Sequence, residues 1–197
     1  MIFPESPDGH HSDSRTAAIM PLSSQHPYFR TFDAADQASS VKIRQLFDYW
    51  LRLYRDGKPG ARTAFDPTEV PNLLSSLLLG DIQSDPFRVF FRLVGTKVAA
   101  FSRLDFSGFY LDALDYRGRD SVEWLDCYRQ VQSSGVGVVG LNRVTWPDGD
   151  PIDYRFAILP LERDGNPAGS FVAIEDYDGI DPRLIPELPE VRAFPKG

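Results

Sequence analysis

The sequence predicts an α+β fold: a five-stranded antiparallel β-sheet with helices on one face, preceded by an amphipathic N-terminal helix. The strand signal is clearest at residues 88–94, where Val89, Phe91 and Leu93 share one face. Gly95 then permits a sharp change of backbone direction, and apolar residues follow at helical spacing. A strand therefore runs directly into a helix that must fold back across it. Three further strand patterns, separated by turn signals, follow later in the chain.

The length of the chain predicts one domain with flanking tails. A chain of 197 residues buries roughly 70% of its unfolded surface, which is enough for one good core. Residues 1–37 are rich in proline, serine and aspartate and predict a disordered extension. Residues 38–180 form the expected folded domain with its leading helix, and residues 181–197 form a proline-rich tail. The true start is left open between Met1 and Met20.

Composition argues against several kinds of partner and site. The net charge of −7 argues against a broad nucleic-acid or anionic-membrane surface, and no stretch approaches the ~20 apolar residues of a membrane span. Cys127 is the only cysteine, so no intrachain disulfide can form and we expect a cytoplasmic location. All three histidines, His10, His11 and His26, precede the folded domain. We therefore expect no metal site, no histidine-dependent catalytic site and no enzyme activity.

The leading helix is predicted to start at Ser39 or Ser40, either of which can act as its N-cap. Its apolar stripe can cover one face of the sheet or meet its own copy in a dimer. Intramolecular packing is the first interpretation. The aromatic side chains keep a protein-partner or homodimer interface open: Phe47, Trp50 and Tyr54.

The remaining elements follow from apolar periodicity and turn residues. Asp66-Pro67 is typical of a short helix start, and Ser84-Asp85-Pro86 is a turn that joins two strands in an antiparallel hairpin. In order, we predict strands at residues 77–82 and 88–94, a helix from Thr96, a helix from residue 120 or 121 to about 133, and strands at residues 136–146, 152–159 and 169–175.

Several short segments, in this order, resemble the PAS domain, and in particular the single-domain PAS family of alphaproteobacteria. The resemblance covers residues 41–174, and Arg92-Leu93-Val94-Gly95-Thr96 is its most specific part. The segments that carry it are Asp48-Tyr49-Trp50, Ala61-Arg62, Phe65-Asp66-Pro67, residues 77–81, residues 91–96, Phe106-Ser107-Gly108 and Leu159-Pro160-Leu161.

The resemblance implies a sensory or interaction module whose sheet encloses a small pocket under its helices. Photoreceptor PAS proteins hold flavin through a reactive cysteine motif, and haem-binding ones mostly use a helix histidine; neither motif is present. Residues 135–140 match G-x-G-x-x-G, but a helix precedes them and a strand follows, the reverse of a dinucleotide site. We therefore expect no cofactor.

The predicted function is a non-catalytic regulatory module that binds a small apolar ligand or a protein partner in signal transduction. The same side chains would simply fill the core if no ligand binds. The predicted ligand contacts are Phe91, Leu93, Phe101, Phe106, Tyr110, Leu111, Phe156 and Ile158.

Two alternatives stay open. One is a cone-shaped α+β enzyme like ketosteroid isomerase, with Asp105, Asp112 and Tyr110 as its catalysts. The other is a ligand-free dimerisation module with a collapsed core. The order of strands distinguishes the ketosteroid-isomerase-like enzyme from a PAS domain, because a PAS sheet places residues 77–82 beside residues 169–175.

Overall fold

The structure is a computed structural model that describes residues 29–31, 40–55, 58–102, 104–114, 122–144 and 152–180. Met1, Met20, most of the predicted extension and the whole predicted tail lie outside the described residues. The strands are β1 (Phe29–Thr31), β2 (Leu77–Ser84), β3 (Phe87–Val94), β4 (Val138–Val144), β5 (Ile152–Arg163) and β6 (Asn166–Asp176). The α-helices are α1 (Val41–Leu53), α2 (Thr96–Ser102) and α3 (Val122–Ser134), and the 3₁₀ helices are η3 (Arg62–Ala64), η4 (Pro67–Glu69), η5 (Pro71–Ser76) and η6 (Leu111–Ala113).

The strands form one antiparallel sheet in the order β1-β4-β5-β6-β2-β3. The first and last strands of the predicted five lie side by side, with Leu77 opposite Ile174, so the strand order that the resemblance implies is confirmed. The sheet also has a sixth strand. Phe29–Thr31 pairs with β4 at the sheet edge, whereas the sequence predicted disorder for this segment. Three residues carry too little periodicity to indicate a strand, and β4 supplies the pairing.

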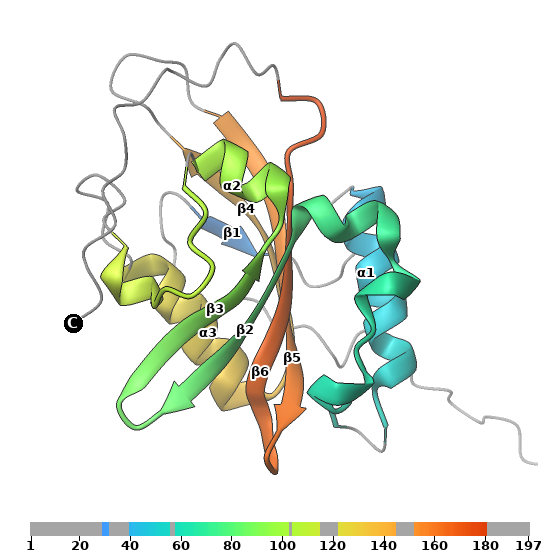
Figure 1. Ribbon diagram of the computed structural model, residues 1–197, viewed down its shortest axis with the longest axis vertical. Helices are drawn as coiled ribbons and strands as arrows, with labels where there is room; N and C mark the ends of the chain where they lie inside the picture. The colour runs from blue at the N-terminus through green and yellow to red at the C-terminus, as the bar shows by residue number, and fades with distance from the viewer. Residues whose placement is uncertain are drawn as a thin grey trace, which may run out of the picture.

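The sheet is covered on both faces (Figure 1). The inner face, as we name it, packs against α2, η6 and α3, while the outer face packs against α1 and η3 to η5. Figure 1 shows α1 and α3 on opposite sides of the strands. Alternation along β6 produces this division, because Phe171 and Ala173 point to the inner face and Val172 and Ile174 to the outer face.

A β-bulge in the β2–β3 hairpin changes one predicted face. Leu79 pairs with Leu93, but Gly80 pairs with Phe91, so Arg92 is an extra residue on β3. After this bulge, the side chains of β3 point to the opposite faces from those that simple alternation predicts. Leu93 is 38% exposed and Val94 is buried in the inner cluster, the opposite of the sequence prediction.

The leading helix α1 packs on the outer face of its own sheet. Ser40 caps it, as predicted, by accepting a hydrogen bond from the backbone N–H of Ile43. Phe47 and Trp50 are buried, and Trp50 Nε1 donates a 2.6 Å hydrogen bond to the carbonyl oxygen of Pro160. This agrees with the first interpretation of the sequence, that the helix packs on its own sheet. A partner or dimer interface at these side chains stays a prediction. Tyr54 is half-buried, with its ring 5.0 Å from that of Trp50.

The segments that carry the family resemblance have identifiable structural roles. A Cβ atom on Gly95 would lie 2.4 Å from the carbonyl oxygen of Ser75, so only glycine fits where β3 meets α2. Ser107 Oγ accepts a hydrogen bond from the N–H of Val94 at 3.0 Å. The hydroxyl of Tyr49 accepts from the N–H of Asp66 at 2.9 Å, which fixes η4 to α1. These residues fix β3 against the start of α2, the loop at Ser107 against β3, and η4 against α1.

Candidate functional site

The predicted ligand site lies mostly in one apolar cluster on the inner face. It brings together the members Phe91, Phe106, Leu111, Phe156 and Ile158. The ring of Phe91 is 4.8 Å from that of Phe106, with an edge-to-face angle of 78°, and 5.9 Å from that of Phe171. These spacings are ordinary aromatic contacts, so the described side chains at the centre of the cluster pack against one another.

Phe101 lies in a neighbouring cluster on the same face. Its ring stacks on Tyr177 at 4.1 Å and meets Tyr154 edge to face at 5.4 Å. Trp124 packs against both clusters and contacts Phe156 at 5.0 Å. Phe101 therefore lies next to the other five predicted residues, at the end of the sheet where β5 begins and β6 ends.

Two predicted contacts lie elsewhere. Leu93 points to the outer face because of the bulge and belongs to neither inner cluster. Tyr110 pairs with Phe90 at the outer edge of β3, and its hydroxyl accepts a 3.0 Å hydrogen bond from Gln83 Nε2. Both assignments to the inner pocket were wrong. The pattern of apolar residues indicates neither the bulge in β3 nor the pairing of Tyr110 with Phe90.

Sequence reasoning missed a group of polar side chains beside Phe101. Asn142 Nδ2 donates a 2.7 Å hydrogen bond to the hydroxyl of Tyr154. Tyr177 donates its hydroxyl proton to Glu175 on the last strand. Burial raises the pKa of the Glu175 carboxyl to about 7, although the hydrogen bond from Tyr177 opposes the shift. The alternation of β6, which was readable from the sequence, already placed Glu175 on the same face as Phe171.

The next residue, Asp176, faces the outer side and connects β6 to the start of α1. Its Oδ2 accepts a 2.6 Å hydrogen bond from Ser40, and Lys42 Nζ lies 3.4 Å from its Oδ1. Lys42 also donates to Asp178 at 2.5 Å. Partial burial disfavours the charge of Lys42, but the two carboxylates outweigh this and raise its pKa. We call Ser40, Lys42, Asp176 and Asp178 the α1 latch.

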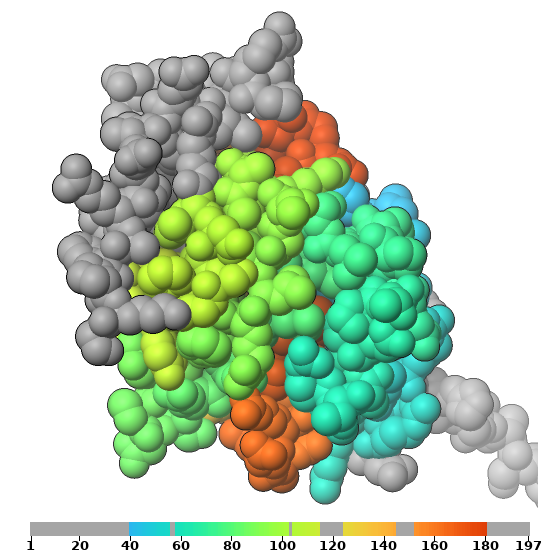
Figure 2. Space-filling model, viewed as in Figure 1, coloured from blue at the N-terminus to red at the C-terminus, as the bar shows by residue number. Residues whose placement is uncertain are grey.

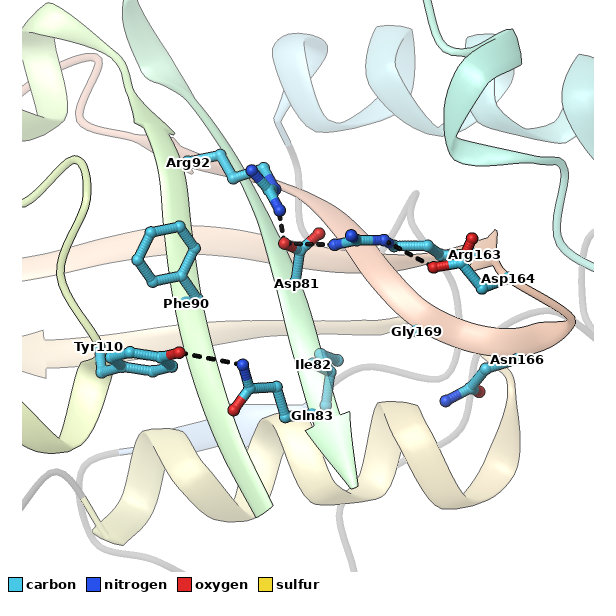
Figure 3. Close-up of a pocket in the computed structure, with 10 residues that line it drawn as sticks. All are labelled: Asp81, Ile82, Gln83, Phe90, Arg92, Tyr110, Arg163, Asp164, Asn166 and Gly169. Atoms are coloured by element: carbon cyan, nitrogen blue, oxygen red, sulfur yellow. Dashed lines mark hydrogen bonds and ion pairs between the residues drawn. The ribbon is translucent and has the colours of Figure 1, made fainter. Parts of the chain in front are cut away.

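A polar cleft of about 430 Å³ opens on the outer face, beyond the part that α1 covers. Its central carboxylate is Asp81, whose Oδ2 accepts from Arg92 Nε and from Arg163 Nη1, each at 2.5 Å (Figure 3). The hydrogen bond that Arg163 donates to Asp81 raises the pKa of Arg163. Figure 2 shows the surface hollowed between the green surface of β3 and the orange end of the β5–β6 hairpin. The sequence analysis did not predict this cleft.

The comparison with protein families agrees with the strand order and the layers. The sequence model of the PAS domain matches residues 38–174, well over half of the chain. The chain belongs to the PAS domain family. PAS domains are sensory modules, and this protein is a sensory domain of that type. No curated protein matches the chain.

Solved structures of light-oxygen-voltage domains resemble this PAS domain weakly. A Rhodobacter sphaeroides light-oxygen-voltage protein is 14% identical, with a TM-score of 0.41 over 61% of this chain and 73% of its own. A fungal photoreceptor domain is 16% identical, with a TM-score of 0.40 over 72% of this chain and 96% of its own. A domain studied with a flavin analogue is 11% identical, with a TM-score of 0.41 over 55% of this chain and 81% of its own. Similarity at this level carries no argument about a ligand.

The residues that the enzyme alternative would use have other roles in the PAS domain. Asp105 is exposed, and its hydrogen bonds with Ser107 lower the pKa of its carboxyl. Asp112 forms a two-point ion pair with Arg88, at 2.9 and 3.0 Å. Tyr110 lies on the outer edge.

No helix within the described ranges is long and apolar enough to cross a membrane.

Proposed function

We propose that this PAS domain is a non-catalytic regulatory module that binds a small, largely apolar molecule at its inner face and transmits binding to α1. The observation that carries the proposal is the end of β6. Glu175 lies on the inner face beside the aromatic clusters, and Asp176 lies on the outer face in the α1 latch. Consecutive residues of a strand move together, so a shift that a ligand causes at Glu175 also displaces Asp176.

The proposed site extends from the polar group at Glu175 into the aromatic clusters. Phe101 stacks on Tyr177, and Phe156 on β5 lies opposite Glu175 on β6. Apolar walls with few polar groups are typical of small-molecule sites. Because the central rings already contact one another, a ligand must separate them. A carboxyl with a raised pKa and a tyrosine hydroxyl supply one hydrogen-bonding end for a ligand that is otherwise apolar.

The proposed response is a change in how tightly α1 is docked. A ligand shifts the balance between docked and released α1 only by the difference in its affinity for the two states. Release would expose Phe47 and Trp50, which are buried when α1 is docked. We propose that a protein partner, or a second copy of the chain, binds these side chains only after release.

The test follows the exchange of α1 amide hydrogens with solvent in the full chain. We expect Glu175→Ala to increase exchange in α1 more than in β2, because it disturbs β6 next to the latch. The matched control is Val131→Ala in α3, a buried residue of the inner cluster far from the latch along the fold. Equal increases in α1 for the two variants would contradict coupling through β6.

The packed rings of the inner cluster favour a second candidate, the ligand-free dimerisation module. Phe91 alone contacts the rings of Phe106, Tyr128 and Phe171. Native mass spectrometry of protein from its own host separates the two. One small molecule bound per chain, and lost on denaturation, supports sensing. An empty dimer that no metabolite library stabilises against heat supports the dimerisation module.

A further inference from the structure

We propose that the outer-face cleft binds a small organic anion, a carboxylate or a phosphate monoester on a flat apolar body, through Arg92 and Arg163. The site is separate from the inner face and does not depend on the function proposed above. It lies between β2, β3 and the β5–β6 hairpin, on the part of the outer face that α1 leaves open.

The first argument is charge. Two guanidinium groups, from Arg92 on β3 and Arg163 on β5, converge on the same oxygen atom of Asp81 (Figure 3). One carboxylate balances one of these two charges. The other nearby acid, Asp164, lies 3.2 Å from Arg163 but its side chain is 87% exposed, so water screens most of its contribution. The formal charges of these four groups balance, but Asp164 holds Arg163 only from the solvent side, so an anion inside the cleft can replace it as the second partner of the two guanidinium groups.

The second argument is preorganisation. The side chain of Asp81 is 9% exposed, whereas those of Arg92 and Arg163 are 48% and 38% exposed. The buried carboxylate thus holds two accessible guanidinium groups in place, and its Oδ1 is buried without a hydrogen-bond partner in the described part of the chain. Each guanidinium keeps donors that Asp81 does not use, and fixed arginine forks match the oxygen pairs of carboxylates and phosphates. Asp81 is a positioning residue in this site.

The bulge in β3 contributes to this arrangement. Arg92 is the extra residue between the pairs Leu79–Leu93 and Gly80–Phe91, and its guanidinium is directed over Asp81 on β2. Bulges redirect single side chains in this way, often next to functional sites. The same irregularity that removes Leu93 from the inner face thus places Arg92 in the cleft.

The third argument is the aromatic wall. Phe90 and Tyr110 lie 5.0 Å apart at an angle of 57°, and Figure 3 shows both rings on the side of the cleft opposite Arg163. The Tyr110 hydroxyl is fixed by Gln83 at 3.0 Å. A flat apolar body can lie against these rings while its anionic group reaches the guanidinium groups. The volume of about 430 Å³ falls within the range of small-molecule sites, roughly 300–1,000 Å³.

The experiment titrates the full ¹⁵N-labelled chain with small anions at constant ionic strength, and NMR monitors the backbone amide signals. The probes are benzoate, acetate, phenyl phosphate and inorganic phosphate, with chloride as the reference anion. We expect saturable shifts in β2, β3 and the β5–β6 hairpin, and tighter binding of the aromatic probes than of acetate or inorganic phosphate. The ratio of benzoate to phenyl phosphate affinity identifies which anionic group the site prefers.

The variants Arg92→Gln and Arg163→Gln should each weaken binding of the better aromatic probe at least tenfold. Either variant leaves Asp81 paired with the other arginine, so the fold is expected to persist. The matched control is Arg143→Gln, an exposed arginine in a two-point ion pair with Asp153 on β4 and β5. It should leave the affinity unchanged. Shifts that chloride reproduces, or affinities that Arg92→Gln and Arg143→Gln lower equally, would overturn the proposal.

Discussion

The hydroxyl of Ser40 donates a 2.6 Å hydrogen bond to Oδ2 of Asp176, and it also accepts a hydrogen bond from the N–H of Ile43. One side chain thus caps the leading helix and ties that helix to the end of the last strand. The start of α1 can therefore separate from the sheet only if the bond to β6 breaks. Four testable predictions concern this bond, the buried Trp50, the carboxyl of Glu175 and the turn at Gly95.

Ser40→Ala should lower the free energy of unfolding by about 1–3 kcal/mol, because it removes a helix cap and leaves the Asp176 carboxylate without its short hydrogen bond. Urea unfolding measures the loss, and hydrogen exchange should show it first in α1. Ser133→Ala is the control, since that exposed hydroxyl donates to the carbonyl of Gln130 within its own helix. If both variants have the same effect on α1, the bond to Asp176 does not secure the helix.

Trp50→Phe should destabilise the chain by about 2–4 kcal/mol, because the side chain is fully buried and its N–H satisfies the carbonyl of Pro160. Thermal and urea unfolding give the value. Leu74→Ala serves as the comparison, since Leu74 is 39% exposed and should cost well under half as much. A small effect of Trp50→Phe would show that α1 does not depend on this contact.

Glu175 should make stability depend on pH in a direction opposite to that of an ion-paired carboxylate. The folded state holds its proton up to about pH 7, while the unfolded state loses it near the ordinary value of 4.5. The free energy of unfolding should therefore fall as pH rises between these two values, by roughly 1–3 kcal/mol, and then level off.

Glu175→Gln should remove this pH-dependent component and leave the variant more stable than the native chain above pH 7. Chemical unfolding of both proteins at a series of pH values measures the difference, in which titrations elsewhere cancel. A difference that does not change with pH would mean that the Glu175 carboxyl is hydrated like any surface acid.

Gly95→Ala should destabilise the chain by more than about 2 kcal/mol, because the new Cβ would lie 2.4 Å from the carbonyl oxygen of Ser75. Gly135→Ala is the informative comparison. Its backbone has a positive φ of 68° but open space around the Cβ position, so it should cost only about 1–2 kcal/mol. Equal losses would indicate that the α2 connection can move away from η5.

Much of the fold was predictable from local pattern. The hairpin of β2 and β3, the helix after Gly95 and the neighbouring positions of β2 and β6 all match the sequence prediction. Strand alternation and helix periodicity reflect interactions between a residue and its close neighbours in the chain, so they are legible without coordinates. The apolar cluster of Phe91, Phe106 and Phe156 follows from the same periodicity.

The errors concern residues whose surroundings come from distant segments. The sequence placed Leu93 in the pocket, but the register between β2 and β3 contains a bulge there. It left open whether the aromatic stripe of α1 covers the sheet or meets a partner, and the structure shows that the sheet buries Phe47 and Trp50. A strand of three residues at Phe29–Thr31 exists because β4 offers an edge to pair with.

The amino-acid sequence by itself determined the main helices and strands, their order and their membership of the PAS family, since these depend on periodicity, caps and turns within short windows. Only the tertiary structure decided which polar groups meet. Asp81, Arg92 and Arg163 lie on three strands, and Ser40 is 136 positions from Asp176. Hydrogen bonds and ion pairs act over a few ångströms of space, and distance along the chain does not indicate which groups folding brings that close.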